Sequence, residues 1–148
     1  MIQGQWFSPG KDISPLLPVR RAVFGRGADA LDGESWNTLV FEDGVPAASG
    51  RIWYRDGAYW FGDICVLESH RGHRLGDLVL RLLLFKAQSH AAPEVRLRCP
   101  ADTAGFFTRL GFSAVSGSDS PVEMMIDGSR IELDSCKNCT KSGCPNRR

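Results

Sequence analysis

The sequence predicts an α/β domain with a mixed sheet, and three observations lead to this prediction. Residues 38–66 alternate β-rich runs with Asp-Gly turn signals, which is typical of antiparallel hairpins. A long segment of helical periodicity follows at 75–90, and a short strand pattern comes directly after it. Hairpins that lead into a strand–helix–strand unit favour a mixed sheet covered by helices.

Composition and charge narrow the range of functions. The chain has 148 residues, of which 43% are hydrophobic and 24% charged, as in an ordinary single globular domain. Its 18 Lys and Arg residues nearly balance 17 Asp and Glu residues, whereas nucleic-acid binders usually carry a basic excess. The sequence shows neither a signal-peptide pattern nor an apolar run long enough to span a bilayer. We therefore expect a cytoplasmic protein without nucleic-acid or membrane partners.

The first third of the chain is expected to hold one strand and one or two short helices. Residues 3–7 fit a strand that Ser8-Pro9-Gly10 ends. Residues 13–24 carry apolar side chains at loosely helical spacing, and their two prolines suit helix starts. The glycine- and aspartate-rich stretch 25–33 is expected to be a loop.

Three hairpin strands are expected next, at residues 38–41, 47–54 and 59–66. Asp43-Gly44 and Asp56-Gly57 would form the turns between them. Gly62 lies inside the third strand, which indicates a bulge or a close approach by another backbone.

The C-terminal half is expected to alternate helices and strands. Leucine-rich apolar residues line one face of a helix at 75–90, and a strand follows at 94–99. A short helix at 104–110 would end at Gly111, and a final hairpin would pair 122–126 with 129–133. The domain is thus expected to span residues 1–133, followed by a cysteine-rich tail at 134–148.

The segment between the third hairpin strand and the long helix has the character of an anion site. It reads Arg71-Gly72-His73-Arg74-Leu75-Gly76, directly before the helix. The first N–H groups of a helix lack partners and carry partial positive charge, and glycines let a ligand approach the backbone. Phosphate or pyrophosphate is the ligand that such a loop suits best.

Two motifs, the loop at residues 71–76 and the segment at residues 104–112, resemble in their order the motifs of the GNAT superfamily of acetyl-CoA-dependent N-acetyltransferases. The run from Val66 through Arg71-Gly72 to Gly76 resembles the superfamily's acetyl-CoA signature, which follows a strand. The segment Ala104-Gly105-Phe106-Phe107-Thr108-Arg109-Leu110-Gly111-Phe112 is similar to its second motif, Ala-x-x-Phe-Tyr-x-x-x-Gly-Phe. The resemblance spans about residues 1–133 and includes pieces near both ends that are similar to a bacterial subgroup.

This resemblance implies a GNAT-like fold in which acetyl-CoA lies where two parallel strands splay apart. The main chain at Cys65 and Val66 would pair with the pantetheine arm. The phosphates would contact Arg71, Gly72, His73, Arg74, Leu75 and Gly76, and Thr103 and Phe107 would flank the thioester. Arg74 replaces a glycine of the signature, and we expect helical geometry there. Phe107 replaces the tyrosine that often protonates the leaving thiolate.

Acyl transfer to a primary amine also needs a proton acceptor, because such an amine is mostly protonated at neutral pH. Asp63, on the strand of Val66, is the first candidate, and Glu123, on a late strand, is the second. The N–H of Val66 would polarise the thioester carbonyl. No metal is expected to be required for catalysis, and the protein would be a monomer or homodimer.

Two alternatives stay open from the residues. Phe107 and Arg74 are compatible with a non-catalytic acyl-CoA-binding or sensor domain. The tail cysteines Cys136, Cys139 and Cys144 have the spacing of part of a zinc site, and they are also compatible with reduced thiols or with a redox role. In that reading the domain would be a scaffold for a metal- or redox-linked interaction.

Overall fold

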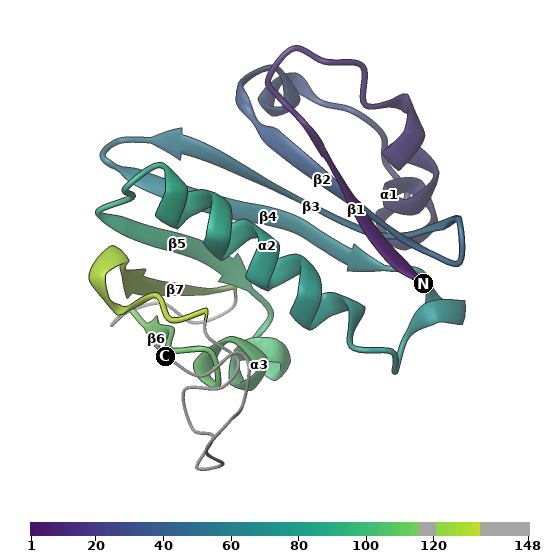
Figure 1. The fold of residues 1–148 in the computed structure, drawn as a ribbon. Coiled ribbons are helices and arrows are strands. Elements are labelled where there is room, and N and C mark those ends of the chain that lie inside the picture. Colours follow the sequence, from purple (N-terminus) through teal and green to yellow (C-terminus); the bar gives the residue numbers. More distant parts are fainter. Residues whose placement is uncertain (116–120, 134–148) are drawn as a thin grey trace, which may run out of the picture.

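A seven-stranded mixed sheet forms the centre of the computed structural model, which describes residues 1–115 and 121–133 (Figure 1). The strand order is β1-β2-β3-β4-β5-β7-β6, and β4 and β5 are the parallel neighbours. The strands are β1 (Ile2–Phe7), β2 (Trp36–Glu42), β3 (Val45–Arg55), β4 (Ala58–Val66), β5 (Glu94–Cys99), β6 (Ser113–Ala114) and β7 (Val122–Asp127). The helices are α1 (Leu17–Phe24), α2 (Leu75–Ser89) and α3 (Ala104–Thr108). The predicted α/β class with a mostly antiparallel mixed sheet is confirmed.

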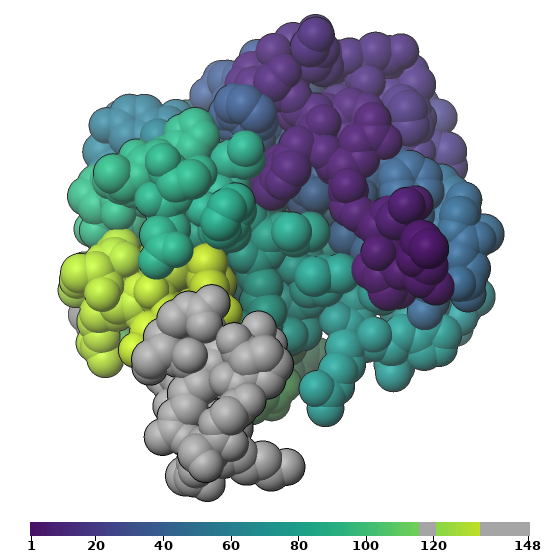
Figure 2. All heavy atoms as spheres, viewed as in Figure 1, coloured from purple at the N-terminus to yellow at the C-terminus, as the bar shows by residue number. Residues whose placement is uncertain are grey.

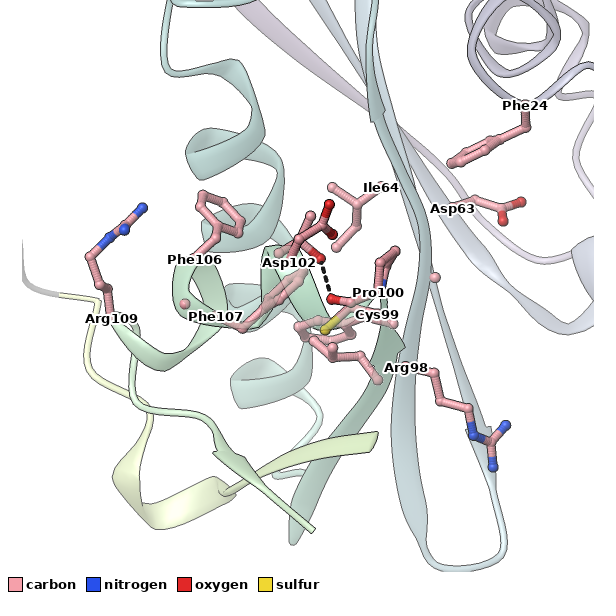
Figure 3. A pocket seen from close by; sticks show the side chains of 15 residues that line it. Phe24, Asp63, Ile64, Arg98, Cys99, Pro100, Asp102, Phe106, Phe107 and Arg109 are labelled. Atoms are coloured by element: carbon pink, nitrogen blue, oxygen red, sulfur yellow. Dashed lines mark hydrogen bonds between the residues drawn. The ribbon is translucent and has the colours of Figure 1, made fainter. Parts of the chain in front are cut away.

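Helices cover both faces of the sheet, so the described chain has three layers. Helix α1 lies on one face, and α2 and α3 lie on the other (Figures 1 and 3). Neighbouring residues of β2 point to opposite sides: Leu39 packs with the α1 residues, whereas Val40 packs with Val79 and Leu83 of α2. This alternation follows from the two-residue period of a strand and explains why the central strands are apolar on both faces.

The predicted strands and helices up to β7 are present, but the final hairpin is not. After β7 the chain forms the 3₁₀ turn Gly128–Arg130, and β7 pairs with β5 and β6. The N–H of Gly128 donates to the Pro93 carbonyl at 2.9 Å, and a Cβ at this position would lie 1.8 Å from the Ala92 oxygen. This close packing turns the chain toward α2 (Figure 2), where Ile131 is buried.

The stretch 25–33, expected as a loop, runs into the 3₁₀ turn Ala30–Glu34. Asp29 caps this turn, and the side chains of Asp29 and Asp32 bond reciprocally to backbone N–H groups. The composition that indicated a loop therefore builds a capped turn. The predicted cysteine tail, with its zinc and redox alternatives, lies outside the described residues.

A β-bulge interrupts β4 at the residue after Gly62. Ser49 pairs with Cys65 and Arg51 pairs with Gly62, so Gly50 alone faces both Asp63 and Ile64. Asp63 takes a left-handed backbone conformation with φ of 52°. The bulge expected near Gly62 is thus present. The close neighbour of Gly62 is the ring of Trp53, which would lie 2.9 Å from a Cβ added at this glycine, rather than another backbone.

Beyond the bulge, β4 and β5 separate. Their parallel ladder joins Tyr59 to Val95 and Trp60 to Arg96, although β4 continues to Val66 and β5 to Cys99. The facing strand edges past these pairs are therefore not bonded to each other. Among the described residues, no helix is both long and apolar enough to cross a membrane.

Candidate functional site

The first of two adjoining cavities lies at the N-terminus of α2 and has a volume of 590 Å³. Six residues predicted for phosphate or pantetheine binding line it: Val66, Arg71, Gly72, Arg74, Leu75 and Gly76. The other lining residues are Asp77, Arg81, Phe106 and Arg109. The loop, the end of β4 and α3 therefore meet around one space.

Backbone N–H groups at the start of α2 are available to a ligand. The first helical hydrogen bond runs from the N–H of Leu78 to the Arg74 carbonyl at 3.1 Å, and no side chain caps this end. The three preceding N–H groups thus have no partner within the helix, and the helix dipole adds positive potential.

The backbone at Arg74 differs from the expectation of helical geometry. Its φ is 64°, in the left-handed region that glycine adopts most easily. A non-glycine residue in this region costs about 1–2 kcal/mol. The arginine therefore keeps the backbone shape that glycine would provide and adds a positive charge to the cavity wall.

The first cavity carries an excess of positive charge, with four arginines and one aspartate among its lining residues. Arg81 is paired with Asp77 at 2.8 Å, and the Nε of Arg71 donates to the Val66 carbonyl at 3.2 Å. Within the described chain, Arg74 and Arg109 have no carboxylate partner. Arg81 and Arg109 were not predicted. Two sequence features could have indicated these arginines: Arg81 lies one helical turn beyond Asp77, and Arg109 lies inside the second motif.

The second cavity has a volume of 740 Å³ and lies where β4 and β5 diverge (Figure 3). Its lining residues come from both faces of the sheet: Asp63 and Phe24 lie on one side, and Ile64, Phe106 and Phe107 on the other. Thr103, predicted to flank the thioester, also lines it. Phe106 and Arg109 line both cavities, so the two form one continuous surface.

Two predicted cofactor contacts lie elsewhere as side chains. His73 turns toward Glu42, with its Nδ1 2.8 Å from the carboxylate, and it lines neither cavity. The Cys65 side chain is buried in the core beneath α1. Burial raises the pKa of its thiol to about 11, and the charge of Asp63 acts in the same direction. The predicted contact at Cys65 involves only its main chain.

Asp63 is bound by arginines from three parts of the chain. The Nη1 of Arg26 lies 3.0 Å from its Oδ2, and the Arg26 Nη2 bonds its Oδ1. The Nε of Arg20 and the Nη2 of Arg51 lie 3.3 and 3.4 Å from the same Oδ2. An Asp63 that accepted a proton would have to give up one of these contacts, which disfavours its predicted role as the base.

These contacts belong to a larger arginine–aspartate network, which comprises Arg20, Arg26, Arg51, Asp29, Asp32 and Asp63. Arg20 binds Asp32 through two hydrogen bonds of 2.8 and 3.1 Å, and Arg51 binds Asp29 through two of 2.7 and 3.1 Å. Three positive and three negative groups balance in the network. Such pairing allows charges to remain buried, because each loses its water but gains an opposite charge.

The network sets the ionisation of Asp32. Burial alone would raise its pKa, but hydrogen bonds from Arg20 and the Asp29 N–H, with the charges of Arg20 and Arg51, lower it to about 2. Asp32 is therefore ionised in the folded protein far into the acid range.

Glu123, the second predicted base, lies on β7 and lines neither cavity. Its carboxylate is 2.5 Å from Arg96 and 3.4 Å from Arg98, and Arg98 is its register partner on β5. In Figure 3 the side chain of Arg98 points away from Phe106 and Phe107. Glu123 is thus a cross-strand ion-pair partner, distant from the apolar side of the cavity.

Asp102 is the carboxylate that sequence reasoning missed. It precedes α3 in the 3₁₀ turn Ala101–Thr103 and lines the second cavity near Ile64 and Phe107 (Figure 3). Within residues 1–115 and 121–133, its side chain makes no hydrogen bond or ion pair. The signal that could have found it is its place two residues before the second motif.

A family model described as an acetyltransferase (GNAT) domain matches residues 34–114, which include β2 to α3 and both motifs. The chain belongs to the GNAT family. N-acetyltransferase YjcF of Bacillus subtilis (strain 168) is 28% identical over 88 residues, 60% of this chain, and the match spans less than two thirds of YjcF (63%). A second acetyltransferase of that organism is 25% identical over 129 residues, which cover 80% of this chain and 84% of the relative.

A crystal structure of an acyl-CoA N-acyltransferase from Pseudomonas aeruginosa has the same fold as this GNAT chain. The two share 21% identity with a TM-score of 0.75, over 84% of this chain and 99% of the other. In this GNAT domain, Phe107 occupies the second-motif position where tyrosine is usual. It is buried, and its ring lies edge-on to Phe106 at 5.1 Å and to Phe112 at 6.1 Å.

We expect the network to make stability fall in acid. The folded pKa of Asp32, about 2, lies below the ordinary value of 3.8, so its contribution is complete above the ordinary value and is lost as pH falls toward 2. Asp32→Asn should therefore lower the free energy of unfolding at neutral pH by about 3–5 kcal/mol, with a shrinking difference in acid. Urea unfolding across this pH range measures both effects. Asp56→Asn, in an exposed turn, is the control, and parallel curves for Asp32→Asn and wild type would contradict the expectation.

Proposed function

We propose that this GNAT domain is an N-acetyltransferase that moves an acetyl group from acetyl-CoA to a primary amine. The observation that carries the proposal is the union of two different cavities. One is arginine-lined at a helix N-terminus, and the other is largely apolar at the divergence of two strands. Coenzyme A has two chemically different ends in the same way. Its phosphates lie at one end, and a pantetheine arm of apolar and amide groups, which ends in sulfur, lies at the other.

The first cavity fits the phosphate end of coenzyme A. The N–H groups at the start of α2 and the side chains of Arg71, Arg74 and Arg109 would bind the phosphate oxygens. Gly76 faces the space between β4 and α3, where a Cβ would be 3.7 Å from Val66 and 4.0 Å from Phe106. A small residue here leaves the entry to the second cavity open.

The second cavity fits the pantetheine arm and the thioester. Main-chain groups of β4 beyond Trp60 are not paired with β5, so they are available to the amide groups of the arm. Phe107 and Thr103 would flank the sulfur. Phe24 and Asp63 lie on the opposite side of the sheet (Figure 3).

In the transfer, the amine nitrogen bonds to the carbonyl carbon and the carbon–sulfur bond breaks. The thioester supplies an activated acyl group and a thiolate leaving group. The N–H of Val66 would stabilise the developing oxyanion. A thiol of pKa about 8.5 leaves without a strong acid, so Phe107 in place of tyrosine is compatible with turnover. The base takes one proton from the ammonium form of the amine before the attack. After the attack the nitrogen gives a second proton to water, and the thiolate takes a proton from water.

Asp102 is the residue that we propose as this base, acting directly or through a water molecule. It lines the cavity and has no competing partner in the described chain, whereas Asp63 is tied to three arginines. Proton acceptors of this kind contribute about 10²–10⁴-fold to rate.

The cofactor assignment predicts that acetyl-CoA binds in the micromolar range and that Gly76→Asp abolishes this binding. The new carboxylate would fill the entry and repel the phosphates, weakening binding by about a hundredfold or more. Calorimetry with acetyl-CoA measures the change. Gly33→Asp, which adds the same side chain in open space at an exposed position of the 3₁₀ turn Ala30–Glu34, should bind normally. Equal affinity in Gly76→Asp and wild type would refute the assignment.

The base assignment predicts that Asp102→Asn lowers kcat by about a hundredfold while the KM for acetyl-CoA changes little. Release of the coenzyme thiol with a panel of amines gives both parameters. Asp56→Asn is the control. An unchanged kcat in Asp102→Asn would exclude this role. Coenzyme binding without thiol release for any amine would favour the non-catalytic sensor alternative.

A further inference from the structure

One carboxylate and two imidazoles meet at the loop of residues 71–76, which we call the coenzyme loop because we propose that it binds the coenzyme phosphates. These three side chains have no part in the proposed transfer. Glu42 ends β2, His70 ends the 3₁₀ turn Glu68–His70, and His73 lies just before α2. The Nδ1 atoms of His70 and His73 lie 2.6 and 2.8 Å from the same Oε1 of Glu42. Three possible ligand atoms therefore converge, all within 4.8 Å of one another.

The protonation chemistry of this cluster suits a cation. A glutamate carboxylate is ionised at neutral pH, so Glu42 offers a negatively charged oxygen. A neutral imidazole has a proton on only one ring nitrogen. With that proton on Nε2, the Nδ1 atoms of both rings can donate a lone pair at the same point as the carboxylate oxygen.

We propose that Glu42, His70 and His73 form a binding site for a transition-metal dication of the zinc type. Two imidazole nitrogens and a carboxylate are ligands that Zn²⁺ and Co²⁺ accept, whereas Mg²⁺ and Ca²⁺ prefer oxygen alone. Bonds of about 2.0–2.1 Å in a tetrahedral site place ligand atoms about 3.3 Å apart. The nitrogen–oxygen separations of 2.6 and 2.8 Å need to widen only slightly.

Burial differs among the three side chains in a way that allows entry of an ion. Glu42 and His70 are each 18% exposed, so packing holds them in place, whereas His73 is 50% exposed. The exposed side leaves room for water as a fourth ligand. The expectation that catalysis needs no metal is unaffected, because these residues line neither cavity.

The position of the site gives it a role in ordering the coenzyme loop. His70 and His73 stand on either side of Arg71 and Gly72, which line the first cavity. An ion held to Glu42 would fix both ends of this short segment to the β2–β3 hairpin. The restrained loop loses less conformational entropy when it binds phosphates, so the ion should tighten coenzyme binding.

Titration of the untagged full chain with Co²⁺ tests the site without reference to activity. Wild type should show ligand-field absorption bands that saturate at one ion for this cluster. His70→Gln and His73→Gln should each weaken that binding by about tenfold or more, because each removes a ligand. His73 is half-exposed, so its variant is not expected to unfold. His90→Gln, which removes the chain's third histidine, is the matched control and should bind as wild type does.

Cobalt bound by the tail cysteines can be distinguished from cobalt bound by the histidine cluster. Cobalt–thiolate coordination gives intense charge-transfer absorption, and this absorption would remain in the His70 and His73 variants. Absence of ligand-field binding in wild type, or equal binding in wild type and both variants, would overturn the proposal. The cluster would then be a set of hydrogen bonds only.

The coupling to the loop rests on the proposed function and has a separate readout. Calorimetry with coenzyme A in the presence of Zn²⁺ should give about fivefold or greater tightening in wild type and none in His73→Gln. Metal binding without any coenzyme binding would leave the site in place and contradict the proposed function. Coenzyme binding that ignores Zn²⁺ would overturn the coupling.

Discussion

The carboxylate of Asp63 is tied to Arg20, Arg26 and Arg51 at the point where β4 has one residue more than β3. A left-handed aspartate costs conformational energy, and the ion pairs offset that cost by fixing its side chain. The bulge re-aims β4, and the parallel ladder with β5 ends within two residue pairs. The second cavity depends on this divergence, because strands paired to their ends would leave no room between them.

The charged residues on the two faces of the sheet differ in whether they have partners of opposite charge. Arginines on the α1 side are balanced by aspartates and hold the sheet, whereas Arg74 and Arg109 on the α2 side have no carboxylate partner in the described chain. Acidic residues divide likewise: Asp32 and Asp63 serve the network, Glu123 joins strands, and Asp102 is left facing the cavity. Partnership, more than residue type, thus separates the structural charges from those that we propose to be functional in this GNAT domain.

Local patterns predicted most of the fold and the loop before α2, because turn signals, helical periodicity and the Arg71–Gly76 motif are each contained in a short segment. The missed features arise between segments. The network joins α1, β3, β4 and the turn at Ala30–Glu34, so no single stretch reveals that Asp63 is occupied. Asp102 and Arg109 become neighbours of β4 only after α3 folds against it. The prediction of a final hairpin was wrong because the contact of Gly128 with Pro93 outweighs the turn preference of Asp127-Gly128.

We propose that the coenzyme binds to the main-chain amides at the start of α2 and to the separated edges of β4 and β5. An NMR titration with coenzyme A that resolves individual amides tests this binding directly. We expect the largest chemical-shift changes on the amides of residues 72–77 and 62–66, with saturation at one equivalent of coenzyme A. Changes confined to other surfaces, with these amides unmoved at saturation, would contradict it.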